Sequence, residues 1–344
     1  METEKEYKVV ELDNFGGTLQ ISSRKFRSPQ KGEVIIKVIC TTIHQADLFY
    51  IQGLYGSKQP KIMPTVPGIE GSGEIVYLGE DVDSYYQGKK CCFTANSNHE
   101  GVFEGAWAQY FYAEARNILV FGNEIDYEKI CFSFINPLTA VGFLDTIEKT
   151  NQKAVAQNAA NSTVGKMFIK FCKIRGIKTL NLVRKEDQIE SLKTLGADYV
   201  ISTSNENWQK DFQEIANGFN IQYCFEAVGS EITGTIMSLL PPCSTIIHYG
   251  NLEEGKPCSN INSRDLIFYK KKLEGWWLSN WIEEVGQELF TQWVYFVITE
   301  ISKGSDIFET KISKRFKLEE INIAKEFYFG GNMSLGKVII NPNN

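Results

Sequence analysis

The chain has 344 residues, 43% of them hydrophobic and 23% charged, so it is long enough for about two domains and can bury a large core. Its net charge of −6 and its pI near 5.4 exclude a typical nucleic-acid-binding protein, because contact with a phosphate backbone needs a basic face. It has no apolar run of about eighteen residues, so no transmembrane helix is predicted. The N-terminus, METEKEYKVVELDNF, is too acidic for a secretory signal or a typical transit peptide.

The eight cysteines lie in or beside apolar runs, and none belongs to a C-x-x-C pair. We interpret them as reduced core residues of an intracellular protein. The three histidines, His44, His99 and His248, are far apart in the sequence. No Cys or His spacing is typical of a metal site, so we predict no bound metal; the alternative is a zinc site that assembles in space from distant residues.

Residues 1–125 are predicted to be rich in β-structure. Runs of β-branched and aromatic residues, several of them bounded by glycine, predict strands at 33–40, 71–79 and 106–112. The segment 43–56 between them predicts a short helix followed by a glycine-bracketed Tyr55. Strands with glycine turns are typical of a small, partly closed barrel.

From Asn136-Pro137 onward, strands and helices alternate. Pro137 suits the first turn of a helix, and the alternation predicts a parallel, doubly wound sheet. The predicted strands are 154–157, 179–183, 199–201, 221–227 and 245–249, and the predicted helices are 164–175, 187–195, 208–217 and 232–240. A strand at 272–277, a helix from 281 to about 302 and a strand at 334–340 follow. We therefore expect a first domain at 1–125, a nucleotide-binding domain at 126–270, and a return to the first domain at 271–344.

The segment 154–184 has the size and order of a dinucleotide-binding βαβ unit. Its first strand ends at a small polar loop, 158–163, which places that loop at a helix N-terminus, where free N–H groups and the helix dipole favour pyrophosphate. Of the usual three glycines only Gly165 is present, and Asn158 and Thr163 stand near the other two places. Neither change forbids phosphate binding, although the Cβ of Thr163 narrows the approach. The alternative is a Rossmann-like unit without a ligand.

Two basic residues, Arg184 and Lys185, end the second strand of this unit. An acidic residue there would accept a hydrogen bond from a ribose 2′-hydroxyl, whereas an Arg accommodates a 2′-phosphate. The pair therefore favours NADP(H) over NAD(H), and the alternative is two solvated charges at a strand end.

Several motifs resemble one family, the medium-chain dehydrogenase/reductase superfamily. They are Asn-Pro-x-Thr-Ala at 136–140, the loop 157–165, Leu-Gly-Ala-Asp at 195–198 and Glu-Ala-Val-Gly at 226–229. Within it, QGLYG at 52–56, NLVR at 181–184 and GWWLSNW at 275–281 are similar to segments of the mitochondrial trans-2-enoyl thioester reductases. The resemblance covers nearly the whole chain and implies a Rossmann domain joined to a GroES-like barrel.

The resemblance also bears on metal binding. Zinc-bearing members place a Cys, a His-Glu pair and a second Cys around the reacting carbonyl. The corresponding places here are His44, Ile69-Glu70 and Leu138, and one ligand in three cannot hold a catalytic zinc. The chain therefore resembles the zinc-free branch. His44, where the enoyl reductases usually have Asn, is expected to be a hydrogen-bonded turn residue at the edge of the pocket.

The implied reaction is reduction of an α,β-unsaturated thioester, enoyl-CoA or enoyl-ACP, by NADPH. The resemblance implies that Tyr55 is the proton donor, since a phenol with a reference pKa of about 10 is protonated at neutral pH. The alternative for Tyr55 is a loop-filling side chain. The substrate pocket is expected to include His44, Trp276, Trp277 and Trp281, although the tryptophans suit a packed domain junction equally well. The cofactor-binding residues are expected to be Asn136, Asn158, Asn161, Ser162, Thr163, Val164, Gly165, Arg184, Lys185 and Tyr249.

Two other functions stay open. One is a zinc-free quinone or alkenal reductase of the same superfamily. The other is an inactive descendant that serves as a structural subunit of a larger assembly, a reading motivated by Thr163 and His44. The resemblance implies a homodimer. It also implies a mitochondrial location, with a cytoplasmic one as the alternative because no basic amphipathic presequence is visible.

Overall fold

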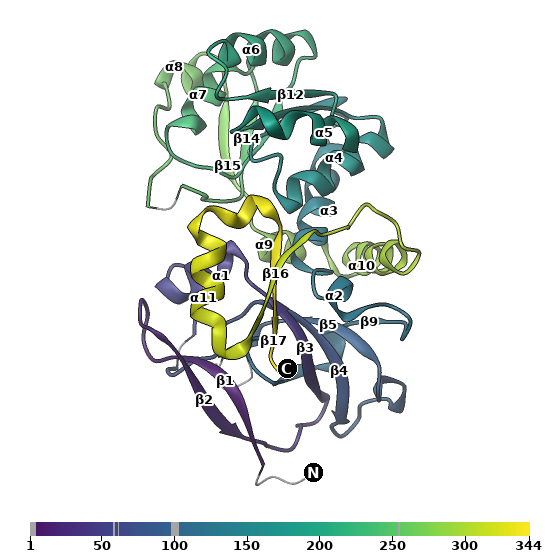
Figure 1. Ribbon diagram of the computed structural model, residues 1–344. Helices are drawn as coiled ribbons and strands as arrows, with labels where there is room; N and C mark the ends of the chain where they lie inside the picture. Colours follow the sequence, from purple (N-terminus) through teal and green to yellow (C-terminus); the bar gives the residue numbers. More distant parts are fainter. Residues whose placement is uncertain (1–4, 58, 61, 98–102, 254) are drawn as a thin grey trace. The chain divides into compact units, whose positions relative to one another are not determined.

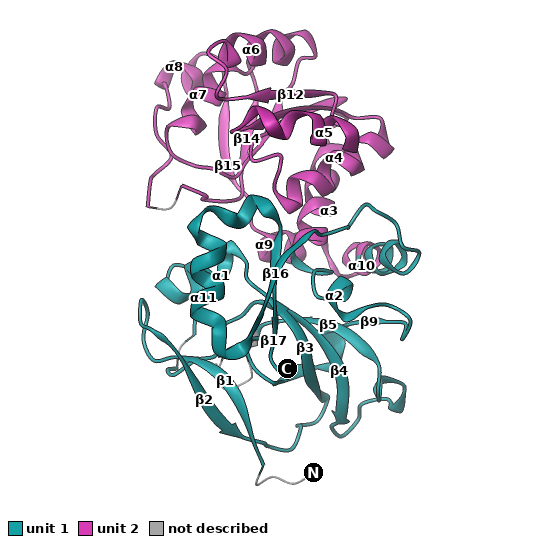
Figure 2. Cartoon of the chain, viewed as in Figure 1, with its two compact units in different colours: residues 1–135, 294–344 teal, residues 136–293 magenta. Residues whose placement is uncertain are grey.

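The computed structural model describes residues 5–57, 59–60, 62–97, 103–253 and 255–344. His99 lies outside these residues. The chain forms two compact units (Figure 2): unit 1 comprises residues 1–135 and 294–344, and unit 2 comprises residues 136–293. Unit 2 is therefore inserted between two segments of the chain that fold together.

The sheet of unit 2 is six-stranded and wholly parallel, in the order β12-β11-β10-β13-β14-β15 (Figure 1). Its strands are β10 (Ala154–Gln157), β11 (Lys178–Val183), β12 (Tyr199–Ser202), β13 (Tyr223–Glu226), β14 (Thr245–His248) and β15 (Lys272–Gly275). The order reverses between β10 and β13, and in a doubly wound sheet ligands bind beyond the carboxyl ends of the strands at such a switch point. The predicted doubly wound parallel sheet is confirmed.

Helices cover both faces of this sheet because successive side chains of each strand point to opposite sides. Ala154, Ala156 and Leu180 pack with Phe212 of α6 and Ile236 of α7 in one cluster. On the other face, Val183 packs with residues of α4 and α5. The helices of this part of the chain are α3 (Ile135–Glu148), α4 (Thr163–Arg175), α5 (Ile189–Leu195), α6 (Trp208–Gly218), α7 (Glu231–Leu239), α8 (Ser263–Ile267), α9 (Leu278–Val285) and α10 (Gln287–Ser302).

Unit 1 contains a seven-stranded sheet in the order β16-β17-β3-β4-β5-β9, with β8 paired to β3. These strands are β3 (Glu33–Thr42), β4 (Glu70–Leu78), β5 (Lys90–Thr94), β8 (Tyr110–Glu114), β9 (Leu119–Phe121), β16 (Ile312–Lys317) and β17 (Lys337–Asn341). Two short pairings complete the unit: β1 (Glu6–Leu12) with β2 (Leu19–Lys25), and β6 (Asn96–Ser97) with β7 (Phe103–Glu104). Because β16 and β17 follow unit 2 in the chain, the C-terminal segment adds two strands to the sheet of unit 1.

The helices of unit 1 are α1 (Gln45–Gln52), α2 (Tyr127–Ile130) and α11 (Ile321–Phe327). One core cluster joins residues distant in the sequence: Val10 of β1, Ile43, Trp107, Ile321 of α11 and Ile340 of β17. The remaining helical turns are Ser84–Tyr86, Ala115–Asn117, Glu186–Gln188, Leu318–Glu320, Tyr328–Asn332 and Met333–Leu335.

Three local predictions differ from the structure. The helix expected from 281 to 302 is two helices, α9 and α10, separated by Gly286 at φ 78°. The strand expected at 106–112 begins only at Tyr110, since the N–H groups of Ala106 and Trp107 bond to Gly68 and Pro67. Among the elements that were not predicted are β1, β2, β5, β9, β16 and α11.

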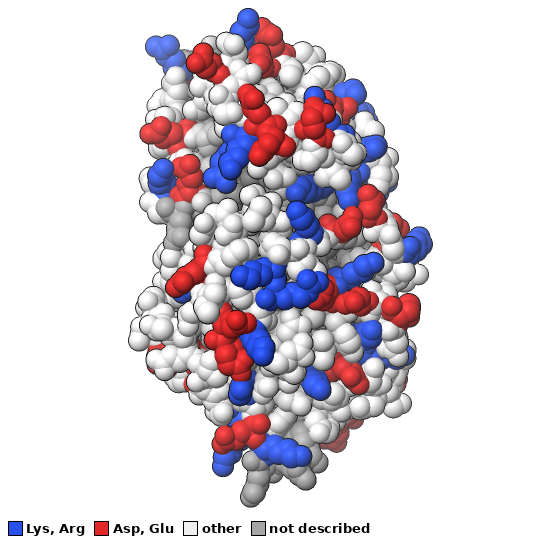
Figure 3. Space-filling view, in the orientation of Figure 1, with Lys and Arg blue, Asp and Glu red and all other residues white. Residues whose placement is uncertain are grey.

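Within the described part of the chain, no helix has the length and apolar character needed to cross a membrane. On the face seen in Figure 3, basic and acidic side chains are interspersed.

Candidate functional site

The loop between β10 and α4 ends in a capped helix. Ser162 is the N-cap residue of α4, and its Oγ accepts a hydrogen bond from the N–H of Gly165 at 3.1 Å. The Ser162 carbonyl accepts from Lys166. Since a helix cannot satisfy its own first N–H groups, those of Thr163 and Val164 are left to face a ligand at the positive end of a 13-residue helix. The predicted loop therefore has the geometry of an anion site.

Gly165 is required by packing. A Cβ at this position would lie 2.7 Å from the carbonyl oxygen of Ala160. The buried Gln157 spans the same turn, donating to the Gly165 carbonyl at 3.1 Å and to Asn181 Oδ1 at 2.8 Å. Gly165, the one glycine of the fingerprint that is present, thus allows the helix to pack closely against the strand.

Asn158, the first residue of the predicted phosphate loop, faces the neighbouring strand. Its Nδ2 donates to Glu226 Oε1 at 2.6 Å, and its Oδ1 accepts from the N–H of Ala227 at 2.8 Å. The side chain is 1% exposed and ties the end of β10 to the end of β13. Asn161, Ser162, Thr163 and Val164 are half-buried.

Glu226 ends β13 and collects several donors in a fully buried position. Oε1 accepts from the N–H groups of Val228 at 2.8 Å and Gly229 at 2.9 Å, and Oε2 accepts from Thr233 and lies 2.5 Å from His248 Nδ1. Burial alone would raise the pKa of Glu226, but the bonds from His248, Asn158 and the Gly229 N–H hold it below its usual value. The carboxylate therefore stays ionised.

A thiol lies beside this pair. Cys258 Sγ is 3.7 Å from His248 Nε2, and ligand atoms of Glu226, His248 and Cys258 all lie within 4.8 Å of one another. The sequence offered a signal for two of the three members of this cluster, because Glu226 and His248 each lie near the end of a predicted strand and pair in register across β13 and β14. Cys258 lies in a loop without a regular pattern, and sequence reasoning missed the cluster.

Arg184 and Lys185 follow the end of β11 and are exposed. Among the described residues neither side chain has a hydrogen bond or an ion pair, and the nearby charge of Arg184 contributes to the lowered pKa of Glu253, after the larger effects of Ser230 and Lys256. The Arg184 guanidinium, which has no ion-pair partner among the described residues, has the charge and position that suit a 2′-phosphate.

Asn136 and Tyr249 lie deeper in unit 2. Asn136 is 6% exposed, and its Nδ2 is buried without a hydrogen-bond partner in the described part of the chain. Burial raises the pKa of Tyr249, and the nearby Glu226 and Cys224 raise it further. Its ring packs edge-on against Phe143 at 4.6 Å. An unpaired buried amide donor and a helix N-terminus with free N–H groups fit a polar, anionic cofactor.

The tryptophans of 276–281 pack inside unit 2. Trp276 lies against Gly142 of α3, where a Cβ would come within 2.5 Å of its ring, and meets Phe143 at 4.9 Å. Trp281 is 5% exposed and donates its indole N–H to Asp145 at 3.0 Å. Trp277 is half-buried and precedes α9. These contacts give Trp276 and Trp281 a packing role, and a pocket role for the three remains a prediction.

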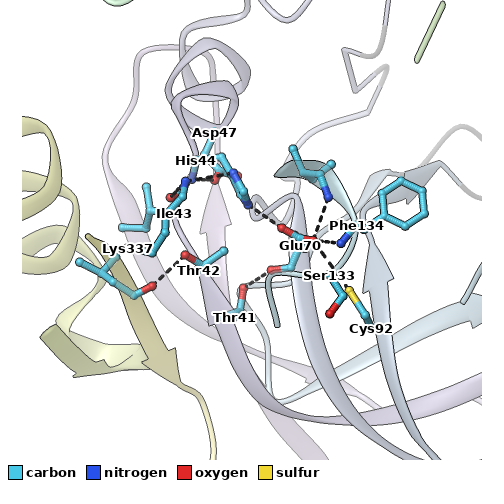
Figure 4. A network of polar contacts seen from close by, with 12 residues as sticks. Thr41, Thr42, Ile43, His44, Asp47, Glu70, Cys92, Ser133, Phe134 and Lys337 are labelled. Carbon is cyan, nitrogen blue, oxygen red and sulfur yellow. Dashed lines mark hydrogen bonds and ion pairs between the residues drawn. The ribbon is translucent and has the colours of Figure 1, made fainter. Parts of the chain in front are cut away.

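A separate buried network lies in unit 1 (Figure 4). His44 Nε2 is 2.7 Å from Glu70 Oε2, and Lys337 Nζ lies 3.2 Å from His44 Nδ1. Glu70 Oε1 also accepts from the N–H groups of Phe134 at 2.7 Å and Ile135 at 3.0 Å. His44, Glu70 and Lys337 are each at least nine-tenths buried.

Burial and the charges of Lys337 and Glu70 determine the protonation state of His44. Burial lowers its pKa first and Lys337 lowers it further, against the opposing effect of Glu70. The Lys337 ammonium can only donate, so Nδ1 accepts and Nε2–H donates to Glu70. Neutral His44 thus bridges the buried ammonium of Lys337 and the buried carboxylate of Glu70. Lys337, from β17, supplies the positive charge that Glu70 needs, and sequence reasoning missed it.

Tyr55 lies in the turn after α1, which ends at Gly53 in the left-handed conformation, and its side chain is half-buried. The helix before it begins at His44, whose N–H donates to Asp47 Oδ2 at 2.6 Å. Burial raises the pKa of Asp47 to about 7, an effect opposed by bonds from His44 and Ile69.

Family models match both units. The model described as alcohol dehydrogenase GroES-like domain matches residues 30–122, and the one described as zinc-binding dehydrogenase matches residues 163–293. Together with the parallel six-stranded sheet, these matches show that the chain belongs to the medium-chain dehydrogenase/reductase superfamily, and they confirm the predicted fold of a GroES-like domain with a Rossmann sheet.

Individual relatives narrow the resemblance. The chain is 29% identical to a mitochondrial enoyl-[acyl-carrier-protein] reductase of Caenorhabditis elegans over 86% of this chain and 85% of that protein. It is 30% identical to the protein of the same name from Arabidopsis thaliana, over 74% of this chain and 66% of that one. A solved structure from Mesorhizobium loti, provisionally named an NADPH:quinone reductase, matches with a TM-score of 0.85 and 25% identity over 99% of this chain and all of that one.

Proposed function

We propose that this protein reduces the C=C bond of trans-2-enoyl thioesters with NADPH. The observation that supports this most is the Ser162-capped start of α4 at the switch point of a parallel sheet, in a chain whose relatives are named enoyl-[acyl-carrier-protein] reductases. The expected substrate is enoyl-CoA or enoyl-ACP. By the same relatives' names we propose a mitochondrial location, and we expect a homodimer.

The nucleotide would be held by residues of unit 2. The N–H groups of Thr163 and Val164 would receive the pyrophosphate, and Arg184 would pair with the 2′-phosphate. When bound, NADPH would supply the hydride. Asn136 offers an amide donor that lacks a protein partner.

Tyr55 would supply the proton at the α-carbon. A phenol is a donor and an acceptor, so it can give up its proton to a developing carbanion and regain one from water. Tyr55 is half-buried in the turn that follows the left-handed Gly53.

A second candidate is an inactive, reductase-like subunit of a larger assembly. Two observations favour it: Thr163 carries a Cβ at the first position of α4, and the ionised Glu226 is bonded to Asn158 of the phosphate loop. A fixed negative charge close to the loop opposes binding of pyrophosphate. A quinone or alkenal reductase shares the cofactor, and the substrate alone separates it from the main proposal.

The deciding experiment is a titration of the purified chain with NADPH and NADH, followed by nicotinamide fluorescence. We expect NADPH to be preferred, and Arg184→Ala to abolish the preference. Arg175→Ala is the matched control, since Arg175 is also exposed but lies at the far end of α4. No binding of either nucleotide at millimolar concentration would favour the inactive subunit.

If NADPH binds, turnover is measured with enoyl-CoA thioesters of increasing chain length and with a quinone. Tyr55→Phe should lose most of the turnover of the thioester while the affinity for NADPH changes little. Unchanged turnover would remove Tyr55 from the mechanism, and activity confined to the quinone would select that class of reductase.

A further inference from the structure

An aromatic side chain from a distant part of unit 1 lies on the turn that carries Tyr55. Gly53, which ends α1, has φ 75°, and a Cβ at this position would lie 2.8 Å from Cγ and 2.9 Å from Cδ2 of Phe15. The ring of Phe15, which belongs to the turn between β1 and β2, is therefore in direct contact with the backbone of Gly53. A side chain at residue 53 is disfavoured twice, by the left-handed conformation and by this contact.

A hydrogen bond joins the same two turns. The N–H of Gly16 donates to the carbonyl of Ile51, in the last turn of α1, at 2.8 Å. Ile51 is 4% exposed and packs in the core cluster that contains Leu12 and Leu19, the residues that end β1 and begin β2. The β1–β2 turn is thus anchored in the core, and it is attached to the end of α1 by one backbone hydrogen bond and one aromatic ring.

Phe15 supplies an apolar contact that a helix end of this type commonly takes from its own sequence. The N–H of Leu54 donates to the Phe49 carbonyl at 2.8 Å and that of Gly53 to the Tyr50 carbonyl at 3.1 Å, which is the pattern of a Schellman motif. In this motif the residue in the place of Leu54 frequently packs against the helix, but Leu54 is 67% exposed. The ring of Phe15 therefore provides the apolar contact at this helix end.

The backbone of Tyr55 is bonded within the same turn. The side-chain amide of Gln59, with its oxygen directed at the turn, accepts from the N–H of Leu54 at 3.0 Å and from the N–H of Tyr55. Both neighbours are donors, which sets the orientation of this amide. Because Tyr55 is two residues from Gly53 and shares this bonded turn, a displacement of Gly53 also displaces the phenol.

We propose that Phe15 is a positioning residue for Tyr55. Its ring holds Gly53 in the left-handed conformation, and the turn that follows then directs the phenol of Tyr55 at the substrate. The role of Tyr55 as proton donor rests on the proposed function, whereas the fixing of the turn by Phe15 does not. Phe15 itself touches neither the nucleotide nor the reacting atoms in this proposal.

The first test measures hydrogen exchange of residues 53–57 in the full chain, without nucleotide or substrate. Phe15→Ala should speed exchange at the N–H groups of Gly53 and Leu54 about tenfold, because the helix end opens more often without the ring. Ile21→Ala is the matched control, since Ile21 lies on β2 of the same hairpin and is 39% exposed, and it should leave this exchange unchanged. Unchanged exchange in Phe15→Ala, or an equal increase in both variants, would overturn the proposal.

The second test determines whether Phe15 acts through Tyr55, with NADPH and an enoyl-CoA thioester as substrates. Phe15→Ala should lower kcat at least about tenfold and leave the KM for NADPH unchanged, because misplacing a reacting group by about 1 Å can cost about 100-fold. Phe15→Tyr keeps the ring on Gly53 and should restore turnover. In the Tyr55→Phe background, Phe15→Ala should change the residual kcat less than about twofold, since no hydroxyl is left to misplace. Equal losses in the two backgrounds would contradict the positioning role.

The outcomes separate this inference from the proposed function. If the unaltered chain turns over no thioester, the proposed function fails, and hydrogen exchange alone decides whether Phe15 fixes the turn. If turnover depends on Tyr55 but Phe15→Ala leaves kcat unchanged, the proposed function stands and the positioning role is wrong. If Phe15→Ala does not fold, Phe15→Leu, which keeps an apolar side chain without the ring, takes its place in both tests.

Discussion

Two His–Glu pairs, one in each unit, are built alike. The His44 and Glu70 side chains approach to 2.7 Å and those of His248 and Glu226 to 2.5 Å, and both carboxylates are completely buried. Each carboxylate also accepts two backbone N–H groups, from Phe134 and Ile135 in the first case and from Val228 and Gly229 in the second. The carboxylate–imidazole contact alone therefore gives the two sites no difference in chemistry.

The third partner and the exposure of the ring make the difference. In unit 1 the ammonium of Lys337 occupies the other nitrogen of His44, and the imidazole is 4% exposed (Figure 4). In unit 2 the Cys258 thiol lies nearly equidistant from the two ring nitrogens of His248, 3.7 Å from Nε2 and 3.9 Å from Nδ1, and the His248 side chain is 24% exposed. His44 thus connects two buried charged groups, whereas His248 is part-exposed and has Glu226 as its charged partner among the described residues.

Removal of the buried cation should have the largest effect. Lys337→Met keeps the length of the side chain but removes the positive charge from the buried network of His44 and Glu70. Breaking such a buried network costs about 3–5 kcal/mol in the free energy of unfolding, to be measured by guanidinium denaturation. Lys31→Met is the control, because Lys31 and Asp81 form an ion pair whose side chains are 70% and 62% exposed. The control should change stability by less than about 1 kcal/mol. A similar small loss for Lys337→Met would show that the network does not hold unit 1 together.

The two histidines should respond differently to the same substitution. His44→Leu removes the imidazole that links Lys337 to Glu70, which keep the carbonyl of Ile43 and two backbone N–H groups, respectively, and it should cost about 3 kcal/mol because two buried charged groups each lose a polar partner. His248→Leu leaves Glu226 with its bonds to Asn158, Val228, Gly229 and Thr233, so we expect a loss of less than about 1 kcal/mol. His44→Gln can still donate to one neighbour and accept from the other, and should recover part of the loss. Equal losses for the two Leu variants would contradict the distinction drawn between the sites.

The sequence alone was sufficient to predict the α/β half of the fold and the loop between β10 and α4. Short apolar runs that alternate with helical patterns between 154 and 249 lie close to β10 through β14, and Gly165 and Ser162 stand where a helix N-terminus needs them. Local pattern works there because each strand is buried on both faces and each helix on one.

The polar networks could not be predicted from the sequence, because their residues come together only in the tertiary structure. Lys337 and His44 are 293 residues apart, and no local pattern relates a lysine in a C-terminal strand to a histidine before a helix. Glu226 and His248 were nearer to prediction, since they end adjacent parallel strands. The tryptophans illustrate the converse: an aromatic run suggests a pocket, but Trp281 is bonded to Asp145 in the packing of unit 2.

The pH dependence of stability should show the smallest effect and tests whether His44 is neutral. Burial, and then Lys337, lowers the pKa of His44, so below the ordinary value of about 6.5 the unfolded chain takes up a proton that the folded chain does not. The His44 contribution to stability is therefore lost as the pH falls below 6.5, by about 1.4 kcal/mol per pH unit until the folded pKa is reached. Asp47 acts in the opposite direction, since its pKa, raised to about 7, makes folding take up a proton between pH 7 and about 4.

A comparison of the unaltered chain with His44→Gln separates the two groups, because Asp47 is present in both and its bond from the backbone N–H of residue 44 is kept. Guanidinium denaturation at pH 7.5, 6.5 and 5.5 should show the stability advantage of His44 over Gln shrinking by about 1 kcal/mol over the last step, since the unfolded histidine is already half protonated at pH 6.5. An advantage that grows toward pH 5.5 would mean that His44 is charged in the folded protein. In that case Glu70 rather than Lys337 would dominate the site, and the contrast with His248 would rest on burial alone.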